Sequence, residues 1–152
     1  MRALRHLAAI VLLPGTVTVA VPALLLSDAD LAPWPLAALG AALIAAGVGM
    51  IAWTVALFAG VGQGTLAPWD PTSRLVVRGP YRHVRNPMIS GVLAVLLGEA
   101  ALFGSLAVLA WWAFVFALNA VYFVLVEEPG LRERFGAEYE AYAARVPRWL
   151  PR

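Results

Sequence analysis

Residues 88–126 read MISGVLAVLLGEAALFGSLAVLAWWAFVFALNAVYFVLV and carry a single formal charge, that of Glu99. One helix needs about 20 apolar residues to cross the hydrocarbon core of a bilayer. These 39 residues therefore predict a hairpin of two spanning helices that turns near residues 103–105. Such a hairpin returns the chain to the side of the membrane from which it started.

Two polar segments flank this hairpin. RGPYRHVRNP (78–87) precedes it, and EEPG (127–130) with FGAEY (135–139) follows it. Because the hairpin brings both ends to one face, a cluster of Arg and His is expected beside an acidic pair at one water–lipid boundary. Opposite charges gathered there are suited to binding a charged small molecule.

The composition indicates an all-α integral membrane protein of one domain. The chain has 152 residues, of which 62% are hydrophobic and 13% are charged, and these proportions fit a membrane protein better than a soluble one. The absence of Cys excludes disulfides, thiol nucleophiles and thiolate metal sites. Two His without Cys give no recognisable ligand spacing, so no metal is expected. A nucleic acid partner is not expected either.

The distribution of Arg predicts the topology. All eleven basic residues are Arg, none lies between Leu7 and Ala67, and the first loop (27–30) is acidic. Basic loops remain in the cytoplasm, which places both termini and the central loop there. The expected location of the protein is a bacterial inner (cell) membrane. A cleaved signal peptide is the alternative for the N-terminus. A retained helix is favoured, because the apolar run is about 20 residues long and lacks a small-x-small cleavage site.

Four spans and two connecting regions are predicted along the single domain, 1–152. Residues 1–60 hold two spanning helices (about 7–26 and 34–59), 61–87 form a cytoplasmic loop, 88–126 form the hairpin, and 127–152 form a cytoplasmic tail with a short surface helix over 131–143. Small residues in the second span predict a face on which two helix backbones approach closely, with simple Ala-rich filler as the alternative. They are Ala38, Ala42, Ala45, Ala46 and Gly49.

The acidic pair Glu127-Glu128 directly follows the apolar run, and Pro129 is expected to end the helix there. Two carboxylates at a helix C-terminus oppose the helix dipole. A cationic ligand or a neighbouring Arg would offset that cost. An ordinary solvated helix end is the alternative.

The basic segment also has two interpretations. Arg82, His83 and Arg85 could hold anionic lipid headgroups, or they could bind the carboxylate or phosphate of a ligand. His83 is in addition a candidate general base. Two polar residues inside the hairpin also have two interpretations each. Glu99 is either functional or hydrated near the outer interface. Asn119 either lines a pocket or bonds across helices.

The order of short motifs resembles the membrane methyltransferase superfamily, which contains isoprenylcysteine carboxyl methyltransferases and phospholipid N-methyltransferases. The resemblance covers about residues 60–151. Its motifs are G-x-G-T (62–65), G-P-Y-R-x-x-R-N-P-M (79–88), E-E-P (127–129), F-G-x-E-Y-x-x-Y (135–142) and V-P-R-W-L-P (146–151). It implies S-adenosylmethionine as methyl donor, bound in a cytoplasmic-facing pocket formed by the last helices and the C-terminal segment.

The resemblance and the charge pattern together give three sets of expected site residues. The cofactor would be held by Gly62, Gly64, His83, Arg85, Asn86, Pro87, Glu127, Glu128 and Tyr139. Catalytic roles fall to His83, Arg85 and Glu128. The acceptor would lie against Met88, Ile89, Val92 and Asn119, with Ile89 standing where many relatives have Tyr.

The leading functional prediction is methyl transfer from S-adenosylmethionine to a lipophilic, membrane-embedded acceptor, either an isoprenoid carboxylate or a phospholipid amine. A small four-helix transporter is the first alternative, but it should hold an acidic residue deep in an early span, and neither of the first two spans does. A membrane assembly subunit without enzymatic activity is the second alternative. Only the two polar segments argue against it.

Overall fold

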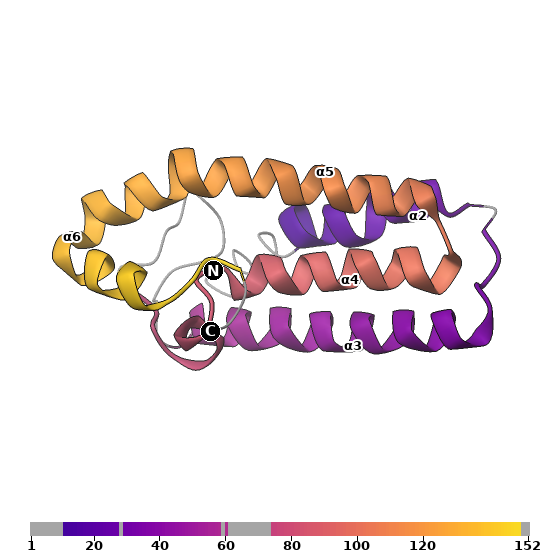
Figure 1. The fold of residues 1–152 in the computed structure, drawn as a ribbon, viewed down its shortest axis with the longest axis horizontal. Helices are drawn as coiled ribbons and strands as arrows, with labels where there is room; N and C mark the ends of the chain where they lie inside the picture. Colours follow the sequence, from indigo (N-terminus) through magenta and orange to yellow (C-terminus); the bar gives the residue numbers. More distant parts are fainter. Residues whose placement is uncertain (1–10, 28, 59, 61–73, 150–152) are drawn as a thin grey trace.

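The computed structural model describes residues 11–27, 29–58, 60 and 74–149. Within these residues the chain is helical and contains no strand. Long helices lie side by side along one axis (Figure 1). In chain order the elements are the π-helix η1 (Val11–Ala20), α2 (Val21–Leu25), α3 (Trp34–Leu57), the 3₁₀ turn η3 (Gly79–Arg82), α4 (Pro87–Phe103), α5 (Leu106–Tyr122), the π-turn η4 (Phe123–Glu127) and α6 (Glu128–Arg145).

Two helical segments are long and apolar enough to cross a membrane. They are α3 and the continuous helical path Leu106–Arg145, each with a mean hydropathy of 2.1 over its most apolar window. The other apolar helices, Pro14–Leu25 and Pro87–Phe103, are shorter. Large apolar side chains are exposed along the outer surface, among them Trp34 (79% exposed) and Trp53 (54% exposed) at opposite ends of α3.

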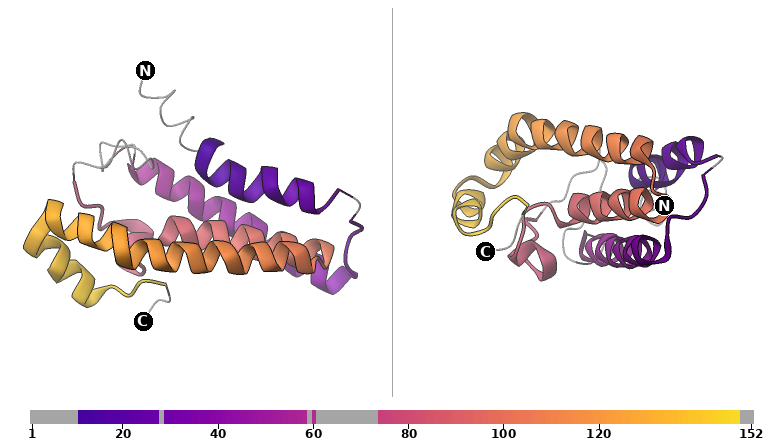
Figure 2. Two further views of the ribbon diagram at one scale, coloured as in Figure 1. Left: turned by 90° about the horizontal axis from the view of Figure 1, so that it is seen from above. Right: turned by 45° about the vertical axis from the view of Figure 1, so that its right-hand side comes forward.

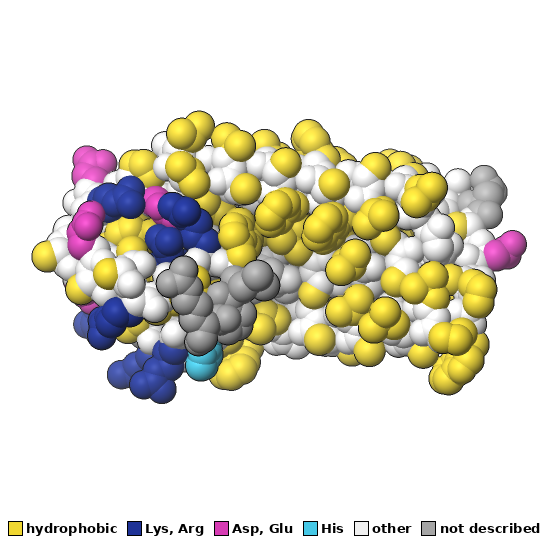
Figure 3. All heavy atoms as spheres, in the orientation of Figure 1, with side chains coloured by type: hydrophobic (Ala, Val, Ile, Leu, Met, Phe, Trp, Pro, Cys, Tyr) yellow, Lys and Arg dark blue, Asp and Glu magenta, His cyan; other side chains and the backbone are white. Residues whose placement is uncertain are grey.

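Charged side chains collect at one end of the molecule. Figure 3 shows Arg and acidic side chains gathered around α6 and a further acidic side chain at the opposite end, while hydrophobic side chains cover the length of α3, α4 and α5. An apolar girdle with one charged end is the surface expected for a protein solvated by lipid.

The closest packing joins α3 to α4 through glycine. A Cβ added to Gly47 would lie 2.6 Å from the carbonyl oxygen of Gly91, and one added to Gly98 would lie 2.7 Å from that of Gly40. These glycines therefore let the two backbones touch directly. In a bilayer, where apolar burial does not drive helix association, such close van der Waals contact is a main source of it.

The prediction of which face of α3 packs closely against another helix is wrong. Ala42, Ala45, Ala46 and Gly49 are exposed, and a Cβ added to Gly49 would meet nothing within 4 Å. The observed face repeats every seven residues through Gly40, Gly47 and the fully buried Thr54. A Cβ would keep the backbones apart, so glycine and not alanine marks the contact.

The second packing layer sets α5 and η1 against α4. Gly104 adopts a left-handed conformation (φ 60°) and ends α4, and the Ser105 side chain accepts a hydrogen bond of 3.3 Å from the backbone N–H of Val108 at the start of α5. The buried core between these helices consists of Val92, Leu93, Leu96 and Val115. The indole N–H of Trp111 donates to the backbone carbonyl of Val17 at 3.0 Å and ties η1 to α5.

The helix does not end at Pro129, contrary to the sequence prediction. In η4 the backbone N–H of Glu128 bonds to the carbonyl of Phe123, five residues back, and Pro129 follows in the first turn of α6. Proline is tolerated there, because a first-turn N–H needs no helical partner. The acidic pair therefore lies within a continuous helical path, and the argument from a helix C-terminus does not apply to it.

The chain instead bends at Gly136, whose backbone has φ 48° and ψ −127°. The positive φ suits glycine and reverses the direction of α6. Figure 2 shows the second half of α6 folding back beneath α5. This bend returns residues 146–149 to the segment that precedes α4.

Candidate functional site

A buried carboxylate lies at the centre of the charged end. Glu128 is only 4% exposed. Its Oε1 accepts from Arg85 Nη1 at 3.0 Å and from Arg148 Nε at 2.5 Å. Its Oε2 accepts from Arg148 Nη2 at 3.0 Å and from Arg132 Nη2 at 3.4 Å. One carboxylate thus joins the segment before α4, the start of α6 and the segment after α6.

Aromatic residues of α6 complete this junction. Arg85 Nη1 also donates to Tyr139 Oη at 3.1 Å, and the backbone N–H of Arg85 donates to the carbonyl of Pro147 at 2.8 Å. The hydroxyl of Tyr142 donates to the backbone carbonyl of Tyr81 at 2.7 Å. Tyr139 and Tyr142 form a small buried core with Val146. The guanidinium of Arg85 is therefore fixed in place by packing as well as by charge.

The electrostatics keep Glu128 ionised. The hydrogen bond from Arg148, together with the charges of Arg85 and Arg132, lowers the pKa of Glu128 although burial opposes this. The same hydrogen bond raises the pKa of Arg148. Arg132 also pairs with Glu140 at 3.2 Å. Three guanidiniums thus face two carboxylates, which leaves one net positive charge in the cluster.

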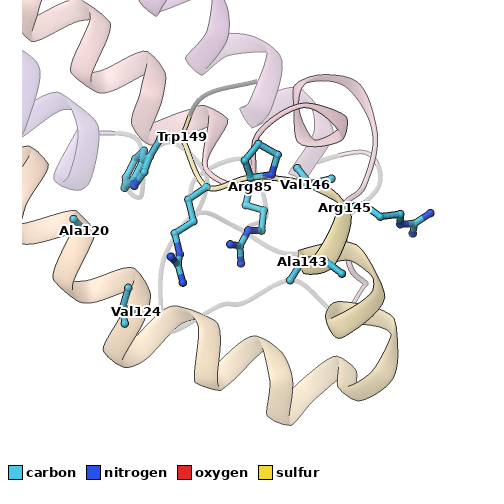
Figure 4. Close-up of a pocket in the computed structure, with 10 residues that line it drawn as sticks. Arg85, Ala120, Val124, Ala143, Arg145, Val146 and Trp149 are labelled. Atoms are coloured by element: carbon cyan, nitrogen blue, oxygen red, sulfur yellow. The ribbon is translucent and has the colours of Figure 1, made fainter. Parts of the chain in front are cut away.

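An open pocket of about 670 Å³ adjoins this cluster. Figure 4 shows Arg85 reaching into the space enclosed by α5, α6 and the segment after α6, whereas Arg145 points away from it. The opposite wall is apolar, and there the ring of Trp149 packs against Phe116 and Phe123 with centroids 5.5 Å apart in both pairs. The lining residues are Arg85, Ala120, Val124, Ala143, Ala144, Arg145, Val146, Pro147, Arg148 and Trp149.

The two members of the acidic pair have different surroundings. Glu127 lies just beyond the apolar run of α5, is half-buried, and makes no hydrogen bond or ion pair with a described residue. Burial raises the pKa of Glu127, and the charge of Arg134 opposes that rise. Glu128, in contrast, is fully engaged with arginines. Of the two, Glu127 is the one whose carboxylate makes no hydrogen bond or ion pair with the described residues.

Other predicted cofactor residues lie around the start of α4. The side chain of His83 is exposed and makes no hydrogen bond with the described part of the chain, so it does not join the cluster. Asn86 precedes α4, and its carbonyl accepts from both the N–H and the hydroxyl of Ser90 at 3.0 Å. Pro87 is buried as the first residue of α4. Gly62 and Gly64 lie outside the described residues.

The predicted acceptor residues lie on α4 and α5. Met88 is partly buried, and Ile89 packs against the core cluster to which the buried Val92 belongs. Asn119 does not line the pocket. Its amide donates to the carbonyl of Val115 in its own helix at 2.8 Å.

Sequence reasoning assigned no role to Arg148 or Arg132. Arg148 stands in the motif V-P-R-W-L-P, which was used only for the resemblance, and it is 63 residues from Arg85 in the chain. The bend at Gly136 brings the two together. A glycine within the polar segment, between Phe135 and Tyr139, was the available sequence signal for that bend.

The fold and the site define a helical membrane protein with a polar pocket at one end of its apolar helices. Residues 36–138 match the phospholipid methyltransferase family, and the chain belongs to that family. A search of curated proteins found no match to the chain. The match covers α3, α4, α5 and the first half of α6, and therefore includes Arg85 and Glu128, while Arg148 lies beyond it. The protein is accordingly a membrane methyltransferase of a family that acts on lipid-type substrates.

Proposed function

We propose that the protein transfers the methyl group of S-adenosylmethionine to a lipophilic acceptor held in the membrane. One observation carries this proposal. The pocket is lined by the guanidiniums of Arg85 and Arg148 and, across from them, by apolar residues of α5 and η4 with Trp149. It lies at the charged end of helices covered by hydrophobic side chains. A charged cosubstrate and a lipid can meet only where water and hydrocarbon adjoin.

The residues present fit the groups of the methyl donor. Its carboxylate suits Arg85, which lines the pocket, and its ammonium suits Glu127, which lies three residues beyond the pocket residue Val124. Gly62 and Gly64 would allow the backbone to approach it. The pocket volume of about 670 Å³ lies within the range of roughly 300–1,000 Å³ typical of small-molecule sites. Met88 and Ile89 would adjoin the acceptor at the membrane side.

The donor supplies an already activated methyl group, so the reaction is an in-line displacement in which the acceptor's lone pair forms the new bond to carbon and the sulfur keeps the electrons of the old one. The protein then contributes mainly by positioning the reactants and excluding water. An amine acceptor must first lose a proton, and His83, the candidate base of the sequence analysis, has an exposed side chain at this end of the molecule. A carboxylate acceptor needs no base.

A homologous series of lipids with one fixed headgroup tests the acceptor. We expect the methylation efficiency, kcat/KM, to rise about fourfold for each added methylene until the apolar wall is filled, since one buried methylene is worth about 0.8 kcal/mol. Methyl transfer to short-chain and long-chain amines, carboxylates and thiols in nanodiscs is the measurement. Ile89→Asp should impair the acceptor more than the cofactor, and Ile89→Leu serves as its control. Equal rates along the series would exclude a lipid-facing acceptor site.

The proposed topology has four spans, η1 with α2, α3, α4 and α5, and cytoplasmic termini. The chain lacks Cys, so single cysteines are clean probes. We expect Ala137→Cys, on the exposed part of α6, to react with a membrane-impermeant thiol reagent only from the cytoplasmic side. Leu31→Cys, exposed at the opposite end, should react only from outside. Labelling of Ala137→Cys in intact cells would contradict the topology.

A further inference from the structure

Glu128 has no acceptor position left for a ligand. A carboxylate offers about four lone-pair positions. Each of its oxygens already accepts two hydrogen bonds, from Arg85 and Arg148 at Oε1 and from Arg148 and Arg132 at Oε2. The side chain is also 4% exposed. An ammonium group could reach this carboxylate only by displacing an arginine from a buried ion pair.

The arginines, in contrast, have donors to spare. Arg85 Nε is buried without a hydrogen-bond partner, which is costly unless a ligand satisfies it. Arg148 uses Nε and Nη2 on Glu128 and leaves Nη1 without a bond to any described residue. Both side chains line the pocket. The cluster has one net positive charge after Glu128 and Glu140 are counted.

We infer that Arg85 and Arg148 form a two-guanidinium site for the carboxylate of the methyl donor, and that Glu128 is the positioning residue that holds both. This assignment rests on the proposed function and divides the acidic pair between two tasks. Glu127 is left to meet the donor's ammonium group. Paired guanidiniums bind a carboxylate with the directed, charge-assisted bonds that give both affinity and orientation.

Two ligands that differ by one carboxylate test the assignment. S-adenosylhomocysteine has the carboxylate and the amine, and its decarboxylated analogue has the amine alone. Calorimetry in detergent should show the wild-type protein binding the decarboxylated ligand about 10- to 100-fold more weakly, the loss expected for a charge-assisted hydrogen bond. Arg148→Gln should weaken the carboxylated ligand by a similar factor and leave the decarboxylated one unchanged.

Glu128→Gln distinguishes positioning from direct contact. If Glu128 acts through the arginines, the substitution weakens S-adenosylhomocysteine and spares the decarboxylated ligand, whose amine is intact. If Glu128 binds the amine, both ligands lose affinity equally. Unchanged binding of the decarboxylated ligand also shows that the variant is folded, and Glu128→Asp replaces it if Glu128→Gln does not fold. Arg78→Gln removes one exposed positive charge at the same end and should change neither affinity.

Each remaining outcome has a separate meaning. Equal wild-type affinity for both ligands, or equal weakening of both by Arg148→Gln, overturns the carboxylate site but leaves the proposed function standing. The Arg148→Gln variant could also bind both ligands normally and lose only the methylation of a phosphate-bearing lipid. That result would overturn the carboxylate site and assign the arginines to binding of the acceptor. A wild-type protein that binds neither ligand contradicts the proposed function, and this inference with it.

Discussion

Replacing Gly47 with Ala is expected to destabilise the protein by about 1–3 kcal/mol, the usual cost of forcing a methyl group into a packed interface. The added Cβ would lie 2.6 Å from the carbonyl oxygen of Gly91 and 2.9 Å from the backbone N of Val95. Backbone atoms cannot turn away as a side chain can, so α3 and α4 would have to separate along their length. Unfolding in mixed micelles, followed by circular dichroism, measures the change.

The matched control is two residues away on the same helix. Gly49 faces open space, so Gly49→Ala should stabilise the protein by roughly 0.5–1 kcal/mol through reduced backbone entropy. The same chemical change thus has opposite signs at neighbouring positions. Two variants with equal midpoints would show that α3 and α4 are not joined through this seam.

Replacing Glu128 with Ala is expected to be the most damaging change at the charged end. It leaves Arg85, Arg132 and Arg148 facing one another without their shared carboxylate. Removing one partner of a buried ion pair costs about 3–5 kcal/mol, and the lower end applies here because Arg132 and Arg148 are 46% and 43% exposed. Thermal unfolding and S-adenosylmethionine binding should both weaken. Glu133→Ala, at an exposed position of α6, should change neither.

The pH dependence of the protein's stability tests the stabilising role of Glu128 independently. The pKa of Glu128 is lowered in the folded protein, so its contribution to stability is fully present above the ordinary carboxyl pKa of about 4.3. That contribution is lost as the pH falls through the lowered value, because the unfolded chain then binds the proton first. The stability difference between wild type and Glu128→Gln should therefore shrink below about pH 4. A difference that persists unchanged in acid would mean that the carboxylate charge is not what stabilises the cluster.

Two features could be predicted from the sequence: the helical fold class, and the contact between the basic and acidic segments at the charged end. Composition and apolar length predicted helices, and α3 begins at Trp34 as expected and ends at Leu57, two residues before the predicted boundary. The expectation that the basic and acidic segments meet is confirmed by the ion pair between Arg85 and Glu128. Both results depend on local hydrophobicity and on the order of charges, which one sequence contains.

The glycine contact between α3 and α4 and the contact between Arg148 and Glu128 could not be predicted from the sequence. Ala and Gly are both small, so α3 alone offers two plausible packing faces, and only the matching glycines of α4 select one of them. Arg148 reaches Glu128 because Gly136 adopts a positive φ and reverses the chain. The prediction that Pro129 ends the helix also failed. The π-turn η4 has already shifted the backbone hydrogen bonds before Pro129, so proline does not end the helix there.

The exposed tryptophans of α3 and the glycine contacts together indicate how far along the helices the site lies. Trp34 and Trp53 are 19 residues apart, about 28 Å at 1.5 Å per residue, which is close to the thickness of the hydrocarbon core. Gly40 meets Gly98 and Gly47 meets Gly91, so each step along α3 is matched by one step back along α4. Continuing that register places Pro87, the first residue of α4, level with Ile51, so Arg85 lies at the same end of the helices as Trp53. Under the proposed function, a lipid acceptor anchored in the leaflet on the Trp53 side would therefore have its headgroup at the depth of the pocket.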